Sequence, residues 1–266
     1  MVLRRDDDGV LAVGQASHAW LCGQFARAWG NERFGAVEPL DEVALGAEQH
    51  DVGMARWDLD PVRNPETGLP KSFMEMGAQA NAGLWSRGPQ RLLTQSRYAA
   101  LLAIRHGRRL YEGFDLDGAS AEDATAVSGF LAHAAELEDF VLATLSADPV
   151  SAPHVSAARL ERNTALVWTW DSLSLALLLD WAPMTLRAVP AADGTAIDIA
   201  MEPVSPRGAS LTPWPFAARE VRVHCDGRRL AHGFDDDEAL AAGLAGARWE
   251  TVQFTLTPGA ELRRGS

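Results

Sequence analysis

The chain has 266 residues, of which 47% are hydrophobic and 23% charged, a composition typical of a folded globular protein with a substantial core. Its formal net charge of −12 argues against a general nucleic-acid binder, which needs a basic surface, but is compatible with a small anionic substrate in a local pocket. Only two cysteines occur, and the sequence has neither an apolar leader nor an apolar run long enough to span a bilayer. We therefore expect a cytoplasmic protein with free thiols and no membrane partner.

The first predicted elements are a short strand over residues 10–13 and a helix over residues 15–29. In that helix His18 lies at helical spacing from the apolar Leu21 and Phe25, so its imidazole faces the core. Taken alone, a histidine in such a position is more often a hydrogen-bonded core residue than a metal ligand.

A second helix is predicted over residues 41–50, and it ends at His50, directly before Asp51. Both side chains continue the apolar face of this helix, and Gly53 is suited to the left-handed conformation that ends helices. A buried carboxylate beside a buried imidazole is costly unless its charge is compensated. A salt bridge, a hydrogen bond or a metal ion would do this, and for an isolated pair the structural explanation is the more common one.

The segment 55–91 carries four prolines and little periodicity, and it predicts irregular structure with one short helix near residues 72–76. A segment of this length without regular structure is uncommon inside a compact domain. Because it follows His50 and Asp51 directly, it is a candidate lid or pocket wall. A packed surface loop would explain it equally well.

Three longer helices are predicted over residues 92–111, 120–145 and 155–181. His106 shares the apolar face of the first with leucine and alanine side chains. Asp171 lies in the middle of the third, which is the most apolar helix of the chain. An acid is rarely placed there without a partner, so Asp171 is the second strong anomaly after the His50-Asp51 pair.

Beyond residue 183 the pattern changes to alternating and β-branched segments separated by Asp-Gly dipeptides, which are hairpin signals. The expected elements are strands over 185–189, 196–200, 221–225 and 250–256 and a helix over 236–245. We therefore predict a mainly α fold (α+β overall), with a helical bundle over residues 1–182. Residues 183–266 would form a small antiparallel β-sheet region packed on that bundle.

Five polar side chains on apolar helix faces stand out in an otherwise hydrocarbon-like interior: His18, His50, Asp51, His106 and Asp171. Helices that face one another would bring them together in a bundle core, where metal sites are commonly built. Imidazole and carboxylate ligands suit Fe, Mn, Ni, Co or Zn, and no thiolate is present to select zinc. We therefore expect one or two divalent transition-metal ions.

The order His … His-Asp … His … Asp on successive helices resembles the HD-domain superfamily of metal-dependent phosphohydrolases. The resemblance covers about residues 10–181 and implies an HD-domain-like helical bundle. The shared ligands of one metal ion would be His18, His50, Asp51 and Asp171. His106 matches the extra histidine of two-metal members, and His133, at the edge of an apolar stripe, is the candidate for a further one.

Over nearly its whole length the chain also resembles an uncharacterised bacterial family, a domain of unknown function, which implies no activity. The matching stretches are 15–18, 48–53, 105–107, 171–174 and 212–216. One departure from the HD-domain pattern concerns substrate binding. Many HD-domain phosphohydrolases have a lysine after the His-Asp-x-Gly stretch, and this chain has Met54 there.

The leading functional hypothesis is hydrolysis of a small phosphorylated metabolite or a nucleotide by metal-activated water, with Glu48 or His133 moving protons. A di-iron oxygenase of the HD-like type is an alternative, in which His133 or another histidine completes a second metal site. A third hypothesis is a non-catalytic module that binds a metal or another ligand. The sequence leaves the choice among these open, and it does not specify an oligomeric state.

Overall fold

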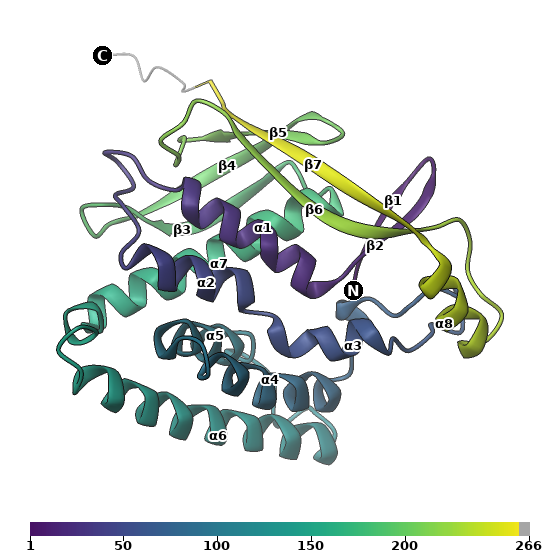
Figure 1. Cartoon of the computed structure of the whole chain (residues 1–266), viewed down its shortest axis with the longest axis horizontal. Helices are drawn as coiled ribbons and strands as arrows, with labels where there is room; N and C mark the ends of the chain where they lie inside the picture. Colours follow the sequence, from purple (N-terminus) through teal and green to yellow (C-terminus); the bar gives the residue numbers. More distant parts are fainter. Residues whose placement is uncertain (261–266) are drawn as a thin grey trace.

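The structure, a computed structural model, describes residues 1–260 and shows a curled β-sheet lying over a group of helices (Figure 1). The helices are α1 (Gln15–Ala28), α2 (Leu40–Gln49), α3 (Ala55–Leu59), α4 (Ala78–Leu92), α5 (Arg97–Arg109), α6 (Ala121–Ser146), α7 (Ala157–Leu179) and α8 (Asp237–Gly246). The strands are β1 (Val2–Asp6), β2 (Gly9–Val13), β3 (Met184–Pro190), β4 (Ala196–Ser205), β5 (Gly208–Thr212), β6 (Val221–Leu230) and β7 (Arg248–Pro258). In this part of the chain, no helix combines the length and the apolar character needed to cross a bilayer.

The sheet has seven strands in the order β1-β2-β6-β7-β5-β4-β3, and all neighbours are antiparallel except the parallel pair β5 and β7. The prediction of a mainly α fold, an HD-like helical bundle with a small C-terminal antiparallel sheet, is therefore wrong. The protein has an α+β fold with a large mixed sheet. Strands from residues 1–182 and from residues 183–266 pair within that one sheet, because β2 lies beside β6.

The N-terminal hairpin β1–β2 shows why the sheet is larger than expected. Alternate residues of β2 face two different apolar clusters, because Leu11 and Val13 join the main core while Val10 and Ala12 join a smaller one beneath α8. Strand β1 was not predicted because its sequence is charged. Its Arg4 side chain is nevertheless buried, since backbone oxygens accept its hydrogen bonds. The Arg4 guanidinium donates to the carbonyl groups at the C-terminal end of α7, at 2.7 and 3.1 Å.

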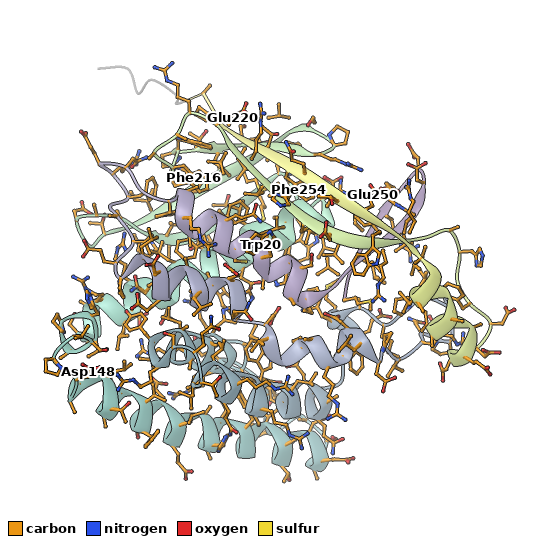
Figure 2. All side chains as sticks on the ribbon, viewed as in Figure 1. Trp20, Asp148, Phe216, Glu220, Glu250 and Phe254 are labelled. Atoms are coloured by element: carbon orange, nitrogen blue, oxygen red, sulfur yellow. The ribbon has the colours of Figure 1, made fainter. Side chains whose placement is uncertain are left out.

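Two further differences concern the C-terminal strands. Strand β5 was not predicted. The predicted turn at Asp226-Gly227 lies inside β6, which continues to Leu230. Gly227 lets this strand pass close to β2, since a Cβ atom there would lie 2.8 Å from Leu11 side-chain atoms. Across the strands, the Glu250 carboxylate of β7 (labelled in Figure 2) accepts from Arg229 of β6 and from Arg207 at 3.1 Å.

The segment 55–91 is more regular than its prolines suggest, so its description as irregular is wrong in part. The short helix expected near residues 72–76 is present as a 3-10 turn over Phe73–Glu75. However, the segment also forms α3 and the 15-residue helix α4, which continues through Pro89. Close packing holds α4 in place, because a Cβ atom built at Gly53 would lie only 2.6 Å from the backbone oxygen of Leu84.

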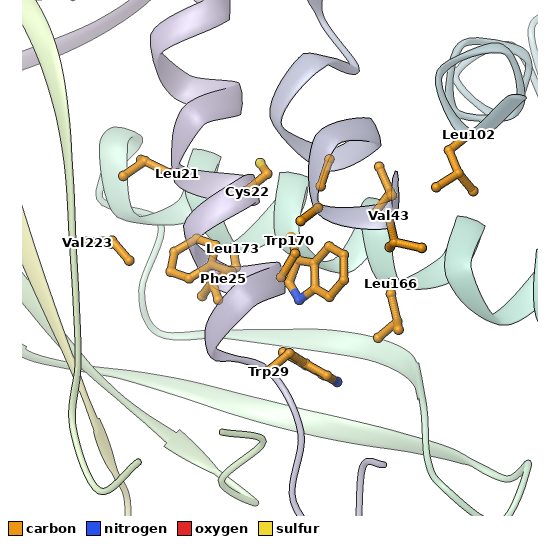
Figure 3. Close-up of a cluster of buried hydrophobic side chains, with 14 of the residues drawn as sticks. Leu21, Cys22, Phe25, Trp29, Val43, Leu102, Leu166, Trp170, Leu173 and Val223 are labelled. Atoms are coloured by element: carbon orange, nitrogen blue, oxygen red, sulfur yellow. The ribbon is translucent and has the colours of Figure 1, made fainter. Parts of the chain in front are cut away.

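The main core lies between the inner face of the sheet and helices α1, α2, α5 and α7 (Figures 1 and 3). Figure 3 shows Phe25 of α1 and Trp170 of α7 in its centre, with Val223 reaching in from β6. Long α6 packs across α4 and α5 on the side away from the sheet, and Asp148 just beyond its end pairs with Arg97 of α5 at 2.5 Å (Figure 2). Helices α1, α5 and α7 and the end of α2 thus meet in the interior, where the five polar side chains are placed.

Candidate metal centre

Four helices each bring a polar side chain to one place beneath the sheet. His18 lies in the first turns of α1, His50 at the C-terminal cap of α2, His106 in the last turn of α5 and Asp171 near the middle of α7, while Asp51 follows His50 directly. All five residues are buried, with at most 7% of their surface exposed. The structure therefore brings together the five residues that the sequence suggested as metal ligands from their inward positions, but not His133, the candidate for a second site.

Two imidazole nitrogens and two carboxylate oxygens face one another at the centre of this group. The Nε2 atom of His18 lies 2.9 Å from Asp51 Oδ2 and 3.4 Å from Asp171 Oδ1. The Nε2 atom of His50 lies 3.6 and 3.5 Å from the same two oxygens. Each nitrogen thus lies within 3.6 Å of one oxygen of each carboxylate.

The orientation of His50 is fixed by the backbone of its own helix. Its Nδ1 atom lies 2.7 Å from the carbonyl oxygen of Ala47 and donates to it, so in the neutral ring the Nε2 atom carries the lone pair. That Nε2 atom is fully buried and has no hydrogen-bond partner. A buried polar atom without a partner is costly, and here it points at two carboxylates.

His18 is oriented in the same way by a residue of α7. The Ser174 hydroxyl donates to the backbone oxygen of Asp171 at 2.9 Å, so its oxygen accepts from Nδ1 of His18 at 2.7 Å. With Nδ1 anchored in this way, the Nε2 atom of His18 faces Asp51 Oδ2 at 2.9 Å, and a proton or a metal ion lies between this nitrogen and oxygen. Metal-binding histidines usually have their second ring nitrogen anchored in this manner.

The electrostatics of the cluster favour a cation. Burial raises the pKa of the Asp51 and Asp171 carboxyl groups, but the surrounding histidines outweigh burial and lower both pKa values below the ordinary range. Burial likewise lowers the pKa of His50, yet the two carboxylates outweigh it and raise the pKa to about 9. Without a metal ion, His50 therefore holds a proton at neutral pH, and a metal ion would replace that proton.

The donor set fits one divalent ion in both spacing and charge. Two ligand atoms about 2.1 Å from a common ion are separated by roughly 3.0 Å at a right angle and roughly 3.4 Å at a tetrahedral angle. The separations of 2.9 to 3.6 Å between the nitrogens and oxygens agree with these values. The two ionised carboxylates would also balance the charge of a divalent cation.

His106 lies at the edge of this centre. Its Nε2 atom is 3.8 Å from Asp171 Oδ2, and its ring lies 4.6 Å from that of His50. Burial and the nearby charge of His50 lower the pKa of His106 to about 4, so its imidazole is neutral at physiological pH. With His50 and Asp171 it forms a second group of suitable donors that overlaps the first.

Gln15 and Ser174 were not predicted as site residues, although each lies one helical turn from a candidate ligand on the same helix. The Gln15 amide donates from Nε2 to Asp51 Oδ2 at 3.3 Å, and its buried Oε1 atom has no hydrogen-bond partner. The backbone nitrogen of Gln15 donates to the Asp58 carboxylate at 2.5 Å, which fixes the start of α1. A polar residue three positions from an inward histidine or aspartate is the sequence signal that could have identified them.

The structure does not bring Glu48 or His133 to the centre. The Glu48 carboxylate pairs with Arg27 of α1 at 2.6 Å, and His133 on α6 is bonded to Gln90 of α4 at 2.9 Å. Cys22 lies nearby, 3.5 Å from Ser174, and burial and the Asp171 carboxylate raise the pKa of its thiol; within the described residues it belongs to neither group of metal donors.

Comparison with known proteins identifies the family of the chain. Residues 1–232 match the model of a family described as "Protein of unknown function (DUF3891)", and this range contains all five residues of the centre. No curated protein and no solved structure matches the chain. None of these comparisons supports the resemblance to the HD-domain superfamily. The chain belongs to the DUF3891 family of proteins of unknown function.

Proposed function

We propose that His18, His50, Asp51 and Asp171 bind a divalent transition metal and that the protein is a metal-dependent hydrolase of a small phosphorylated metabolite or nucleotide. The observation that carries the proposal is that the Nε2 atoms of two imidazole rings each lie within 3.6 Å of an oxygen of both carboxylates, inside an apolar interior. A salt-bridge network would explain the charges of these groups. Protonated histidines in such a network would donate from Nδ1 to Ser174 and Ala47 and from Nε2 to the carboxylates, so the metal content of the protein decides between the network and a metal ion.

A bound divalent ion supplies an acidified water molecule and neutralises charge on a phosphoryl group. The chain's own residues prepare the site for that chemistry. Ser174 and the Ala47 carbonyl group hold the two imidazole rings, and the neutral His106 borders the centre without adding positive charge. The free Oε1 atom of buried Gln15 is an acceptor that can orient a water molecule or a substrate hydroxyl group.

Phosphate chemistry is favoured by the order of the candidate ligands along the chain, which is that of HD-domain phosphohydrolases, and not by the fold. We do not assign proton transfer to Glu48 or His133, since both are bonded to residues outside the centre. The same placement weakens the di-iron oxygenase alternative. In the described part of the chain, His106 is the one additional histidine beside the four proposed ligands.

Elemental analysis of the protein, purified without chelator, tests the metal site directly. We expect about one equivalent of a transition metal in the wild type and its loss in Asp51→Asn and Asp171→Asn, which keep the side-chain shape but remove the charge. Asp198→Asn is the matched control, because Asp198 is a surface carboxylate paired with Arg187 at 2.5 Å. It should retain the metal in full.

The reaction is tested next, by release of phosphate from a panel of small phosphate esters and nucleotides with the metal found. We expect turnover that disappears in Asp171→Asn and persists in Asp198→Asn. If the wild type carries no metal and gains none on incubation with Mn, Fe, Co, Ni or Zn ions, the proposal fails. The non-catalytic binding module would then be the better explanation of the fold.

A further inference from the structure

A second polar feature lies one helical turn from the candidate metal centre. Three arginines of α5, Arg105, Arg108 and Arg109, line a cavity of about 500 Å³ together with residues of α6 and α7. We call this cavity the arginine pocket. Its volume lies within the range of about 300–1,000 Å³ that is usual for small-molecule sites. In a chain with a net charge of −12, such a concentration of positive charge at a cavity is unexpected.

The positive charge of the arginine pocket is only partly neutralised. Glu138 of α6 is buried, and it accepts from both Arg105, at 2.8 Å, and Arg108. Arg105 also donates to the Thr164 hydroxyl at 3.4 Å. One carboxylate thus serves two guanidinium groups. The two other glutamates that line the cavity, Glu112 and Glu161, are exposed and form no ion pair with the three arginines within residues 1–260.

Arg109 differs from its neighbours because its guanidinium group lies over an aromatic ring. The group is 4.6 Å from the ring centre of Trp168, and the chain offers it no carboxylate partner within residues 1–260. Stacking holds the planar guanidinium in place while its N–H groups stay available at the edge. This arrangement suits bidentate binding of an oxyanion.

Trp168 also connects the arginine pocket with the candidate metal centre. Its ring lies 5.5 Å from the ring of His106, and on α7 it stands between Thr164 of the pocket and Asp171 of the centre. The spacing of four and three residues places these side chains on one face of the helix. Seven residues correspond to roughly 10 Å along the axis, which sets the distance between the two sites along α7.

We propose that the arginine pocket binds a phosphate group of the substrate at a distance from the metal centre, with Arg109 as the main ligand. Arg109 is the pocket's arginine without a carboxylate partner in the described residues, and its planar donor fork suits the oxygens of a phosphate group. The role of the pocket as a substrate subsite rests on the proposed function. Its affinity for phosphate does not.

Titration calorimetry of the chelator-treated protein with inorganic pyrophosphate tests the pocket without metal. We expect saturable binding of one equivalent at low salt, weakened about tenfold or more in Arg109→Gln. Arg187→Gln is the matched control, because Arg187 is an exposed arginine on β3 paired with a single aspartate. Arg109→Lys keeps a cation over Trp168 but loses the guanidinium fork, so it should weaken binding several-fold even if the glutamine variant folds poorly.

The outcomes test the arginine pocket independently of the proposed metal site. Undiminished pyrophosphate binding in Asp171→Asn, together with loss in the Arg109 variants, supports the pocket even if no metal is found. Absence of saturable binding in the wild type, or equal binding by wild type and both Arg109 variants, overturns it. Succinate is the comparison ligand, because it carries two carboxylates in place of phosphates. Binding of succinate as tightly as pyrophosphate overturns the assignment of the pocket to phosphate.

Discussion

The raised pKa of His50 predicts that the stability of the metal-free protein falls between pH 6.5 and 9. His50 is buried between Asp51 and Asp171, and its pKa of about 9 exceeds the value of 6.5 for an ordinary histidine. Below pH 6.5 the proton is bound in both the folded and the unfolded state, so the interaction stabilises the fold in full. Between pH 6.5 and 9 the folded state keeps the proton and the unfolded state releases it. Each rise in pH therefore favours the unfolded state, and the stabilisation is lost.

The size of the effect follows from the difference between the two pKa values. A difference of about 2.5 pH units corresponds to about 3 kcal/mol in the free energy of unfolding. The metal-loaded protein should behave differently. A histidine that binds a metal is neutral, so the folded state has no His50 proton to lose, and its stability should stay nearly constant over this range.

Urea unfolding at pH 6, 7, 8 and 9 would test this prediction, with protein that has been treated with chelator and with protein reloaded with the metal found. The difference between the two curves cancels the titration of groups far from the centre, such as Cys225. His224→Gln is a suitable control, because His224 is exposed on β6. Equal pH dependence with and without metal, or a flat curve without metal, would refute the reasoning.

Three substitutions test individual parts of the fold and the site. Ser174→Ala removes the anchor of His18 and should lower metal affinity about 10- to 100-fold in a competition titration, with a change in melting temperature of only a few degrees. Gly53→Ala places a Cβ atom 2.6 Å from the Leu84 backbone oxygen and should cost about 1–3 kcal/mol in urea unfolding, unlike Gly83→Ala on the exposed face of α4. Arg4→Met removes three hydrogen bonds to backbone oxygens and should cost about 2–4 kcal/mol, measured in the same way.

The candidate ligands could be predicted because inward orientation is a local property of one helix. Each of them shares the apolar stripe of its own helix, which the 3.6-residue period reveals without knowledge of the neighbouring helices. The same geometry explains why Glu48 was misplaced. It precedes His50 by two residues, or about 200° around the helix axis, so it points to the opposite side and meets Arg27 instead.

His133 was misplaced for a different reason. An apolar stripe shows that a helix has a buried face, but it does not show which neighbouring helix that face contacts. The inward face of α6 packs against α4 and α5, and His133 accordingly lies with Trp85 at a small cavity outside the centre. The extent of the sheet was hidden in a similar way. The pairing of Val13 with Gly227 joins strands more than two hundred residues apart, and no local sequence pattern predicts this pairing.

The correction of the fold does not affect the metal proposal, because the fold and the metal site were inferred from different observations. The resemblance to HD-domain proteins suggested a helical bundle, whereas the candidate ligands lie on helices beneath a seven-stranded sheet. Similar chemistry recurs on unrelated folds when the same side chains meet in the same geometry. The proposed function therefore rests on the convergence of two Nε2 atoms and two carboxylates and not on the fold. Thr164 of the arginine pocket and Asp171 of the metal centre lie about two helical turns apart on one face of α7.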